Sequence, residues 1–228
     1  MVYTYEYPRP SVTVDIIVFG LDGNELKVLL IQRAQDPFKG DWAIPVGFVD
    51  MEEDIEAAAH RELEEETGVK DVFIEQLYTF GKPKRDPRGR VITVAYYALV
   101  NLDDHPVKAA SDADEAKWFK IDELPSLAFD HGEILKVAID RLRGKVRYQP
   151  IGFELLPEKF TLSSLQHLYE TILGKPINKR NFRTKLQRLG FLKQLERQTD
   201  VPHRPAYLYS FDKEAYERMM EEGINFEL

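Results

Sequence analysis

Residues 47–69 read GFVDMEEDIEAAAHRELEEETGV, and this stretch decides how the rest of the chain is interpreted. Alanine, leucine and glutamate dominate its second half and a glycine closes it, so we predict a helix over residues 55–67. Glu62, Glu65 and Glu66 lie three and four residues apart, which places their carboxylates on one face of that helix. Like charges so close together repel, and a divalent cation would convert the repulsion into ligation.

The segments around this helix alternate between apolar runs rich in β-branched residues and turns, which is typical of strands. Residues 42–48 are a short apolar run broken by Pro45 and Gly47. The predicted strands are 11–20, 26–33, 72–80, 90–100 and 117–120, and a further helix is predicted at 131–143. A sheet combined with helices in this order predicts an α/β (α+β) domain.

The pattern changes after residues 144–152, where two glycines and a proline indicate a domain junction. Helices are predicted at 161–173 and 179–189, followed by strands at 191–197 and 206–211. Helix, short turn, helix and hairpin is the order of a winged helix-turn-helix. We therefore predict two domains, 1–147 and 148–228.

Charge separates the same two parts of the chain. The 228 residues carry a net charge of −8, but residues 1–149 account for −9 and residues 150–228 for +1. Residues 175–204 hold nine basic and two acidic side chains, which predicts a different partner for the second domain. The absence of cysteine excludes disulfides and thiolate metal sites. No membrane span or secretory signal is recognisable, so we expect a cytoplasmic protein.

The acidic helix and its flanks resemble the Nudix box of the Nudix hydrolase superfamily, and the likeness extends over roughly residues 11–143. The pattern has many fixed positions, so a chance match is improbable. Those positions are filled by Gly47, Glu53, Arg61, Glu62, Leu63, Glu65, Glu66, Gly68 and Val69. The resemblance implies an α/β/α sandwich with a mixed sheet and cleavage of a diphosphate bond. The chain departs from the common family pattern at Val46, where a second glycine is frequent, and a side chain there would narrow the backbone near the helix.

The resemblance also implies a cofactor and roles for the conserved types of residue in the box. Mg²⁺ or Mn²⁺ would be bound by Glu62, Glu65 and Glu66, because hard cations prefer carboxylate oxygens. Glu53 would support the metal or the attacking water, and Arg61 would orient a loop glutamate through a charge-assisted hydrogen bond. The alternative for an isolated acidic run is a solvated helix face.

A loop between the predicted strands at 72–80 and 90–100 is strongly basic, and a bound diphosphate would require such cations. The candidate substrate-binding residues are Arg33, Arg85, Arg88, Arg90 and Gly47. The alternative is an exposed hairpin turn with solubilising charges. The segment 85–99 resembles ADP-ribose-directed Nudix domains and their regulator relatives, so ADP-ribose is the leading ligand. FAD, NADH and dinucleoside polyphosphates stay open.

The general base is expected in the loop that precedes residue 117. Asp112, Asp114 and Glu115 are all candidates, and the sequence does not choose among them. The candidate catalytic residues are Glu53, Arg61, Glu65 and Glu115.

The second domain resembles the winged helix of Nudix-related transcriptional regulators of NAD and sugar metabolism. Its basic helix at 179–189 could contact DNA phosphates and base edges. The candidate DNA-binding residues are Lys179, Arg180, Asn181, Arg183 and Lys185. The alternative is a scaffold or dimerisation element, and DNA binding would predict a homodimer.

Two functions follow from these resemblances. The first is a Mg²⁺-dependent Nudix pyrophosphohydrolase that cleaves ADP-ribose or a related nucleoside diphosphate derivative to AMP and a phosphorylated product. The second is an ADP-ribose-responsive DNA-binding regulator. The complete box favours the enzyme, and the basic second domain favours the regulator.

Overall fold

The computed structural model of the protein describes residues 5–23, 25–102, 104–105, 113–199, 202 and 204–222. The chain divides into two compact units, the first made of residues 1–20 and 27–139, the second of residues 21–26 and 140–228. The division falls inside the helix α2 (His131–Lys145). The domain boundary at 147/148 stays a prediction. None of the helices in the described part of the chain has the length and apolarity that a bilayer crossing requires.

The first unit is built on a seven-stranded sheet in the order β3-β2-β1-β6-β5, with β4 paired to β1 and β7 paired to β2. Its strands are β1 (Ser11–Asp22), β2 (Glu25–Arg33), β3 (Trp42–Ala43), β4 (Val46–Phe48), β5 (Ile74–Phe80), β6 (Val91–Asn101) and β7 (Ala113–Lys120). The predicted strands are all present. Strand β7 begins earlier than predicted, because its first residues pair with the end of β2 at Arg33.

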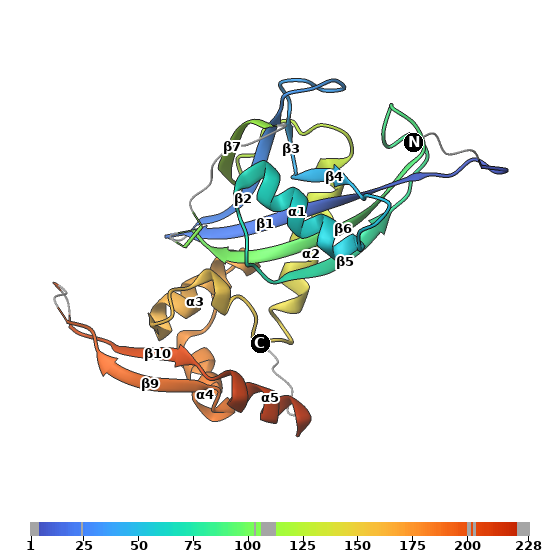
Figure 1. Cartoon of the computed structure of the whole chain (residues 1–228). Helices are drawn as coiled ribbons and strands as arrows, with labels where there is room; N and C mark the ends of the chain where they lie inside the picture. Colours follow the sequence, from blue (N-terminus) through green and yellow to red (C-terminus); the bar gives the residue numbers. More distant parts are fainter. Residues whose placement is uncertain are drawn as a thin grey trace. The chain divides into compact units, whose positions relative to one another are not determined.

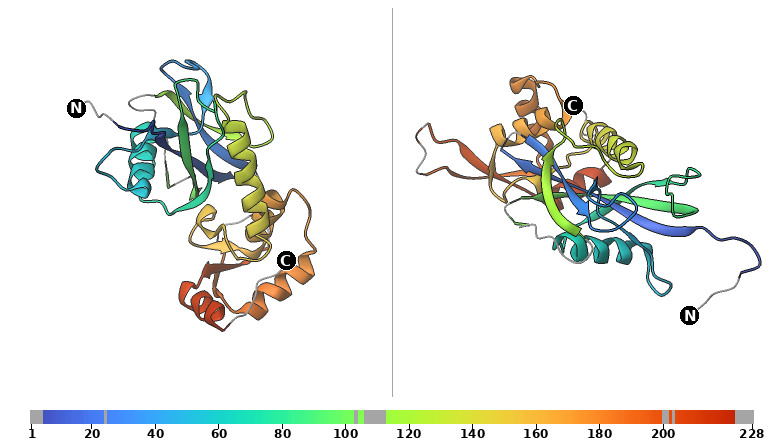
Figure 2. Two further views of the ribbon diagram at one scale, coloured as in Figure 1. Left: turned by 90° about the vertical axis from the view of Figure 1, so that its right-hand side faces the viewer. Right: turned by 90° about the horizontal axis from the view of Figure 1, so that it is seen from above.

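The helices α1 (Ile55–Thr67) and α2 lie on opposite faces of this sheet (Figure 2). Figure 1 shows α1 running across one face. Alternate residues of β1, namely Val14, Ile16 and Val18, are fully buried in the core cluster that also contains Ala58, Ala59 and Leu63 of α1. The predicted bounds of α1 are confirmed, since local signals fix both ends: Asp54 caps its first turn and Gly68 ends it with φ 74°.

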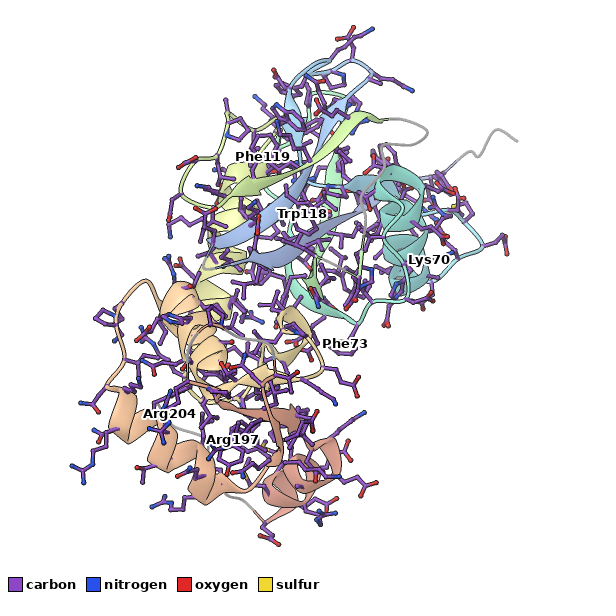
Figure 3. All side chains as sticks on the ribbon, turned by 90° about the vertical axis from the view of Figure 1, so that its left-hand side faces the viewer. Lys70, Phe73, Trp118, Phe119, Arg197 and Arg204 are labelled. Carbon is purple, nitrogen blue, oxygen red and sulfur yellow. The ribbon has the colours of Figure 1, made fainter. Side chains whose placement is uncertain are left out.

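Neighbouring residues of β7 point to opposite faces of the sheet, as the pleat requires. Trp118 packs against the core beneath α1, whereas the ring of Phe119 meets that of Trp42 edge-on at 4.6 Å. Figure 3 labels both β7 residues. The strand that carries the candidate base Glu115 is therefore held on both sides.

After the end of α2, the described residues of the second unit form the helices α3, α4 and α5 and a three-stranded sheet in the order β8-β10-β9. Its elements are the 3-10 turn Phe153–Leu155, β8 (Phe160–Thr161), α3 (Leu162–Leu173), α4 (Lys179–Leu189), β9 (Leu192–Arg197), β10 (Tyr207–Phe211) and α5 (Lys213–Glu221). The predicted caps are confirmed, since Thr161 accepts from Ser164 N–H and Asn178 from Asn181 N–H. Strand β8 and helix α5 were not predicted.

Aromatic rings form the core of the second unit. The rings of Phe153 and Phe211 stack at 4.3 Å, and Phe191 meets each of them edge-on at 6.0 Å. Such pairs add stability beyond the area they bury. The aromatic core connects the 3-10 turn to the hairpin β9–β10, which follows the basic helix α4.

Candidate active site and nucleic-acid interface

Arg61 of α1 is the centre of a cluster of acidic side chains. Its Nε and one terminal nitrogen bind both oxygens of Glu53, at 3.0 and 2.6 Å. The other terminal nitrogen donates to Glu62 at 2.7 Å and to Glu65 at 3.2 Å. A further bond of 3.1 Å reaches the carbonyl oxygen of Phe48 in β4. The predicted orienting role of Arg61 therefore has a geometric basis, because one guanidinium ties the preceding loop, the strand and the helix together.

The surroundings shift the pKa values of Glu53 and Glu62 in opposite directions. Hydrogen bonds from Arg61 and from the backbone N–H of Asp50 hold the pKa of Glu53 at about 2. Burial raises the pKa of Glu62 above its ordinary value and outweighs its bond to Arg61. A cation beside Glu62 would offset this cost of burial, because an opposite charge favours the ionised carboxylate.

The backbone of β4 lies directly against the acidic face of α1. A Cβ built on Gly47 would overlap the carboxyl group of Glu62, so only glycine allows this approach. The neighbouring N–H of Val46 donates to Glu66 Oε2 at 2.8 Å, and Glu66 is 5% exposed. The departure from the family pattern at Val46 therefore leaves its backbone N–H in place to hold Glu66.

The donor set suits a hard divalent cation, although the three carboxylates do not converge in this conformation. Glu62 and Glu66 both line a cavity beside α1, while the side chain of Glu65 is 52% exposed and contacts Arg61. Within the described ranges, no group of three or more acidic, histidine or cysteine side chains is close enough to hold an ion. Three carboxylates on one helix face, with Gly47 leaving space for one of them, fit Mg²⁺ or Mn²⁺ once Glu65 turns from Arg61.

A cavity of about 340 Å³ opens beside this acidic face. Glu62 and Glu66 line it together with Arg33, Arg88 and Phe48. Gly47, a predicted substrate-binding residue, also lines it, and its role stays a prediction. The cavity thus combines acidic, basic and aromatic walls, which suits a ligand with several chemically distinct parts.

Two of the four predicted substrate-binding arginines reach the cavity. Arg33 lines it while donating to the carbonyl oxygens of Pro37 and Gln35, at 2.8 and 3.3 Å. Arg88 lines it too, and its Nε and one terminal nitrogen bind the carboxylate of Asp86.

The other two arginines do not line the cavity. The side chain of Arg85 is only 4% exposed and binds both oxygens of Asp130, at 2.9 and 2.7 Å, with Asp15 at 3.3 Å. Arg90 donates to the carbonyl oxygen of Gly81 at 2.7 Å. Arg85 is therefore a buried structural cation and not a phosphate ligand in this conformation.

Arg85 belongs to a buried polar network that the sequence did not predict. Burial raises the pKa of Asp15 to about 6 and lowers that of His131 to about 3. Neutral His131 accepts the N–H of Ile44 at its Nδ1, 2.9 Å away, which places the ring proton on Nε2. The network joins β1, the basic loop and the start of α2.

The candidate general bases are only partly described. Glu115 is exposed on β7, lies opposite Gln32 of β2 and is not among the residues that line the cavity. Asp112 and the side chain of Asp114 lie outside the described residues. The identity of the base stays a prediction.

A broad groove in the second unit separates α4 from the hairpin β9–β10, and its volume is about 880 Å³. Two predicted DNA-binding residues, Lys179 and Arg183, line it from α4, and Arg183 donates to the hydroxyl of Ser163 at 2.9 Å. Arg180 and Asn181 are exposed on the same helix and Lys185 is half-buried there, but none of the three lines the groove.

The hairpin contributes basic and aromatic residues to this groove that the sequence did not single out. Arg197, Arg204 and Tyr207 lie in its wall, and Figure 3 labels both arginines. The guanidinium of Arg197 stacks 4.5 Å from the ring centre of Tyr207. Position in a hairpin, beside a basic helix, was the sequence signal that could have identified them.

The family profile of the NUDIX domain matches residues 9–138, and that of the NrtR DNA-binding winged helix domain matches residues 152–211. The chain belongs to the Nudix family. Its fold, a Nudix α/β/α sandwich followed by a winged helix-turn-helix domain, is as predicted.

Relatives of this Nudix protein include a regulator and an enzyme. The chain is 39% identical to the ADPR responsive transcriptional repressor NtrR of Acinetobacter baylyi over 224 residues, 95% of this chain and 89% of that protein. It is 42% identical to an ADP-ribose pyrophosphatase of Methanocaldococcus jannaschii over 130 residues, 57% of this chain and 73% of the enzyme.

A solved structure resembles both domains together. The crystal structure of Shewanella oneidensis NrtR complexed with a 27mer DNA matches with a TM-score of 0.79 and 37% identity, covering 90% of this chain and 95% of that one. The similarity therefore includes the winged helix as well as the Nudix domain.

Proposed function

We propose that the protein is a DNA-binding transcriptional regulator whose Nudix domain binds ADP-ribose. The observation that carries the proposal is that both sites occur in one chain: the cavity beside the Nudix box and the basic groove between α4 and the hairpin. Similarity to an ADPR responsive repressor over 95% of the chain supports this combination.

The chemistry of each site agrees with its ligand. A diphosphate requires cations and hydrogen-bond donors, and the cavity offers Arg33, with carboxylates that would bind Mg²⁺ or Mn²⁺ between protein and phosphate. The groove offers Lys179, Arg183, Arg197 and Arg204 to a phosphate backbone. We extend the proposal to a homodimer, since palindromic operators are read by two-fold symmetric proteins.

Fluorescence anisotropy with operator fragments from the regions upstream of NAD-metabolism genes tests DNA binding. Arg183→Ala should weaken binding, and the loss should grow as the salt concentration falls, because a phosphate contact is released. Arg218→Ala is the matched control, since this α5 arginine is 62% exposed and does not line the groove. ADP-ribose should change the affinity of the wild type. Absence of DNA binding at low salt, or equal behaviour of the two variants, contradicts the regulator.

The second candidate function is hydrolysis of ADP-ribose, and the complete Nudix box favours it. In this reaction water forms a bond to one phosphorus, the bridging P–O bond breaks, and AMP and ribose 5-phosphate leave. The bound metal would neutralise the phosphate oxygens and lower the pKa of water. The chain's own residues would position the acids, with Arg61 holding Glu53 and Val46 N–H holding Glu66. The protein would then consume its own effector.

Release of AMP from ADP-ribose in the presence of Mg²⁺ tests this second candidate. Glu66→Gln keeps the shape of the side chain and an acceptor for Val46 N–H but removes the charge. We expect this variant to lose orders of magnitude in rate while its thermal midpoint stays close to that of the wild type. If the wild type binds ADP-ribose tightly but does not turn it over, the enzyme function is rejected and only the regulator function remains.

A further inference from the structure

An alternating row of aromatic rings and guanidinium groups lies at the cavity of the Nudix domain, and three of its members, Arg33, Phe48 and Arg88, line that cavity. The guanidinium carbon of Arg88 lies 5.0 Å from the ring centre of Phe48 and 5.5 Å from that of Phe129. The guanidinium carbon of Arg33 also lies near Phe129, 4.9 Å from its ring centre. Phe38 meets Phe129 edge-on at 4.7 Å. All three cation–ring distances are within the roughly 6 Å over which such pairs attract.

The outer rings of this row are open to solvent. Phe48 is 42% exposed and Phe38 is 39% exposed, although both are large apolar side chains. Removing an apolar ring from water is favourable, so a planar partner that covers these surfaces would be stabilised there. Phe48 lines the cavity itself, and its carbonyl oxygen accepts a hydrogen bond from Arg61, which also binds Glu62 and Glu65 of α1.

Asp86 holds the edge of the Arg88 guanidinium, while the rings of Phe48 and Phe129 pack against it. The Nε and one terminal nitrogen of Arg88 both bind Asp86, at 3.1 and 2.7 Å, and the backbone N–H of Arg88 binds the same carboxylate at 2.8 Å. Asp86 is only 4% exposed, so this anchor is shielded from solvent. A guanidinium whose edge is engaged in this way is suited to stacking, as arginine does on nucleobases and aromatic rings.

We infer that Phe48 and Arg88 form the nucleobase platform of the cavity. The carboxylates Glu62 and Glu66 mark the part that takes the diphosphate and metal, and Phe48 with Arg88 takes the base of the same ligand. This assignment rests on the proposed binding of a nucleoside diphosphate. It differs from the sequence-based expectation for Arg88, which was contact with phosphate. The platform makes the cavity select nucleotides over sugar phosphates and inorganic diphosphate.

Calorimetric titration of the full chain with AMP, ADP-ribose, ribose 5-phosphate and inorganic pyrophosphate tests the assignment. Phe48→Ala should weaken AMP and ADP-ribose about ten- to a hundredfold, the range expected for loss of one stacking contact, and leave ribose 5-phosphate and pyrophosphate unchanged. Phe48→Trp should restore the nucleotide affinities. The matched control is Phe73→Ala, because Phe73, labelled in Figure 3, is 78% exposed and does not line the cavity.

Arg88→Lys separates stacking from phosphate contact. Lysine keeps the charge but has no flat face, so the nucleotides should weaken selectively, as with Phe48→Ala. Equal weakening of all four ligands, or wild-type affinities in both variants, overturns the platform while the proposed function stands. A wild type that binds neither AMP nor ADP-ribose overturns both.

Discussion

The Nε2 atom of His131 lies 3.6 Å from Oδ1 of Asp15, and both side chains are almost completely shielded from solvent. Burial acts on the two groups with opposite consequences for stability. The pKa of Asp15 is raised from 3.8 to about 6, so the folded state binds this proton more tightly than the unfolded state does. The resulting stabilisation of the fold is lost as the pH rises through 6. The pKa of His131 is lowered from 6.5 to about 3, so its contribution is lost as the pH falls below 6.5.

Asp15→Asn should therefore expose the titration of His131. Between about pH 4 and 6 the two contributions nearly cancel in the wild type, because the folded state gains a proton at Asp15 while the unfolded state gains one at histidine. In the variant, the free energy of unfolding should fall on acidification more steeply, by up to about 1.4 kcal/mol per pH unit. Arg85 and Asp130, which face the same site, keep their ion pair.

Urea unfolding at several pH values measures this slope. The exposed Asp41→Asn serves as the control and should follow the wild type. Parallel curves for wild type and Asp15→Asn would show that the buried pair does not titrate as the structure indicates.

Arg85→Met should destabilise the Nudix domain strongly. The guanidinium is bound by Asp130 and Asp15, and removing it leaves the buried carboxylate of Asp15 and the half-buried one of Asp130 without their cation, a change that typically costs about 3–5 kcal/mol. Arg90→Met removes a cation from the same loop that donates to the carbonyl oxygen of Gly81 at an exposed position, and should cost less than about 0.5 kcal/mol. Chemical denaturation compares them. A small effect at Arg85, accompanied by a loss of ligand affinity, would return this residue to the phosphate-binding role that the sequence suggested.

Arg85 also shows why part of the site could not be predicted from the sequence. The helix α1 was predicted residue for residue, because Asp54 and Gly68 fix its ends locally and the box fixes its acidic face. The role of Arg85 depends on Asp130, 45 residues further along the chain, and a basic loop looks the same whether its arginines face phosphate or the interior. The row of aromatic rings and guanidinium groups was missed for the same reason, since Arg88 lies between Phe48 and Phe129 only in the folded chain.

Gly47→Ala should disturb the site and leave the fold intact. The added Cβ meets the carboxyl group of Glu62, the end of a flexible side chain, so Glu62 rotates away while the strand stays in place. We expect turnover, or ADP-ribose affinity in the presence of Mg²⁺, to fall by up to about a hundredfold through misplacement of one ligand. Gly144→Ala is the control, because nothing surrounds that helical position, and it should stabilise by up to about 1 kcal/mol. Unchanged affinity in Gly47→Ala would show that Glu62 does not contribute to ligand binding.

Arg61→Gln tests whether the acidic face of α1 binds a metal. In the wild type the guanidinium bonds to Glu53, Glu62 and Glu65 and compensates their mutual repulsion. The variant leaves that repulsion in place, so its thermal midpoint should fall in metal-free buffer. A divalent cation relieves the same repulsion, and ligand binding to the folded state raises stability by mass action. Millimolar Mg²⁺ should therefore raise the midpoint of Arg61→Gln by more than that of the wild type, and Na⁺ at equal ionic strength should not. Equal responses of the two proteins to Mg²⁺ would mean that these carboxylates do not act together on a metal.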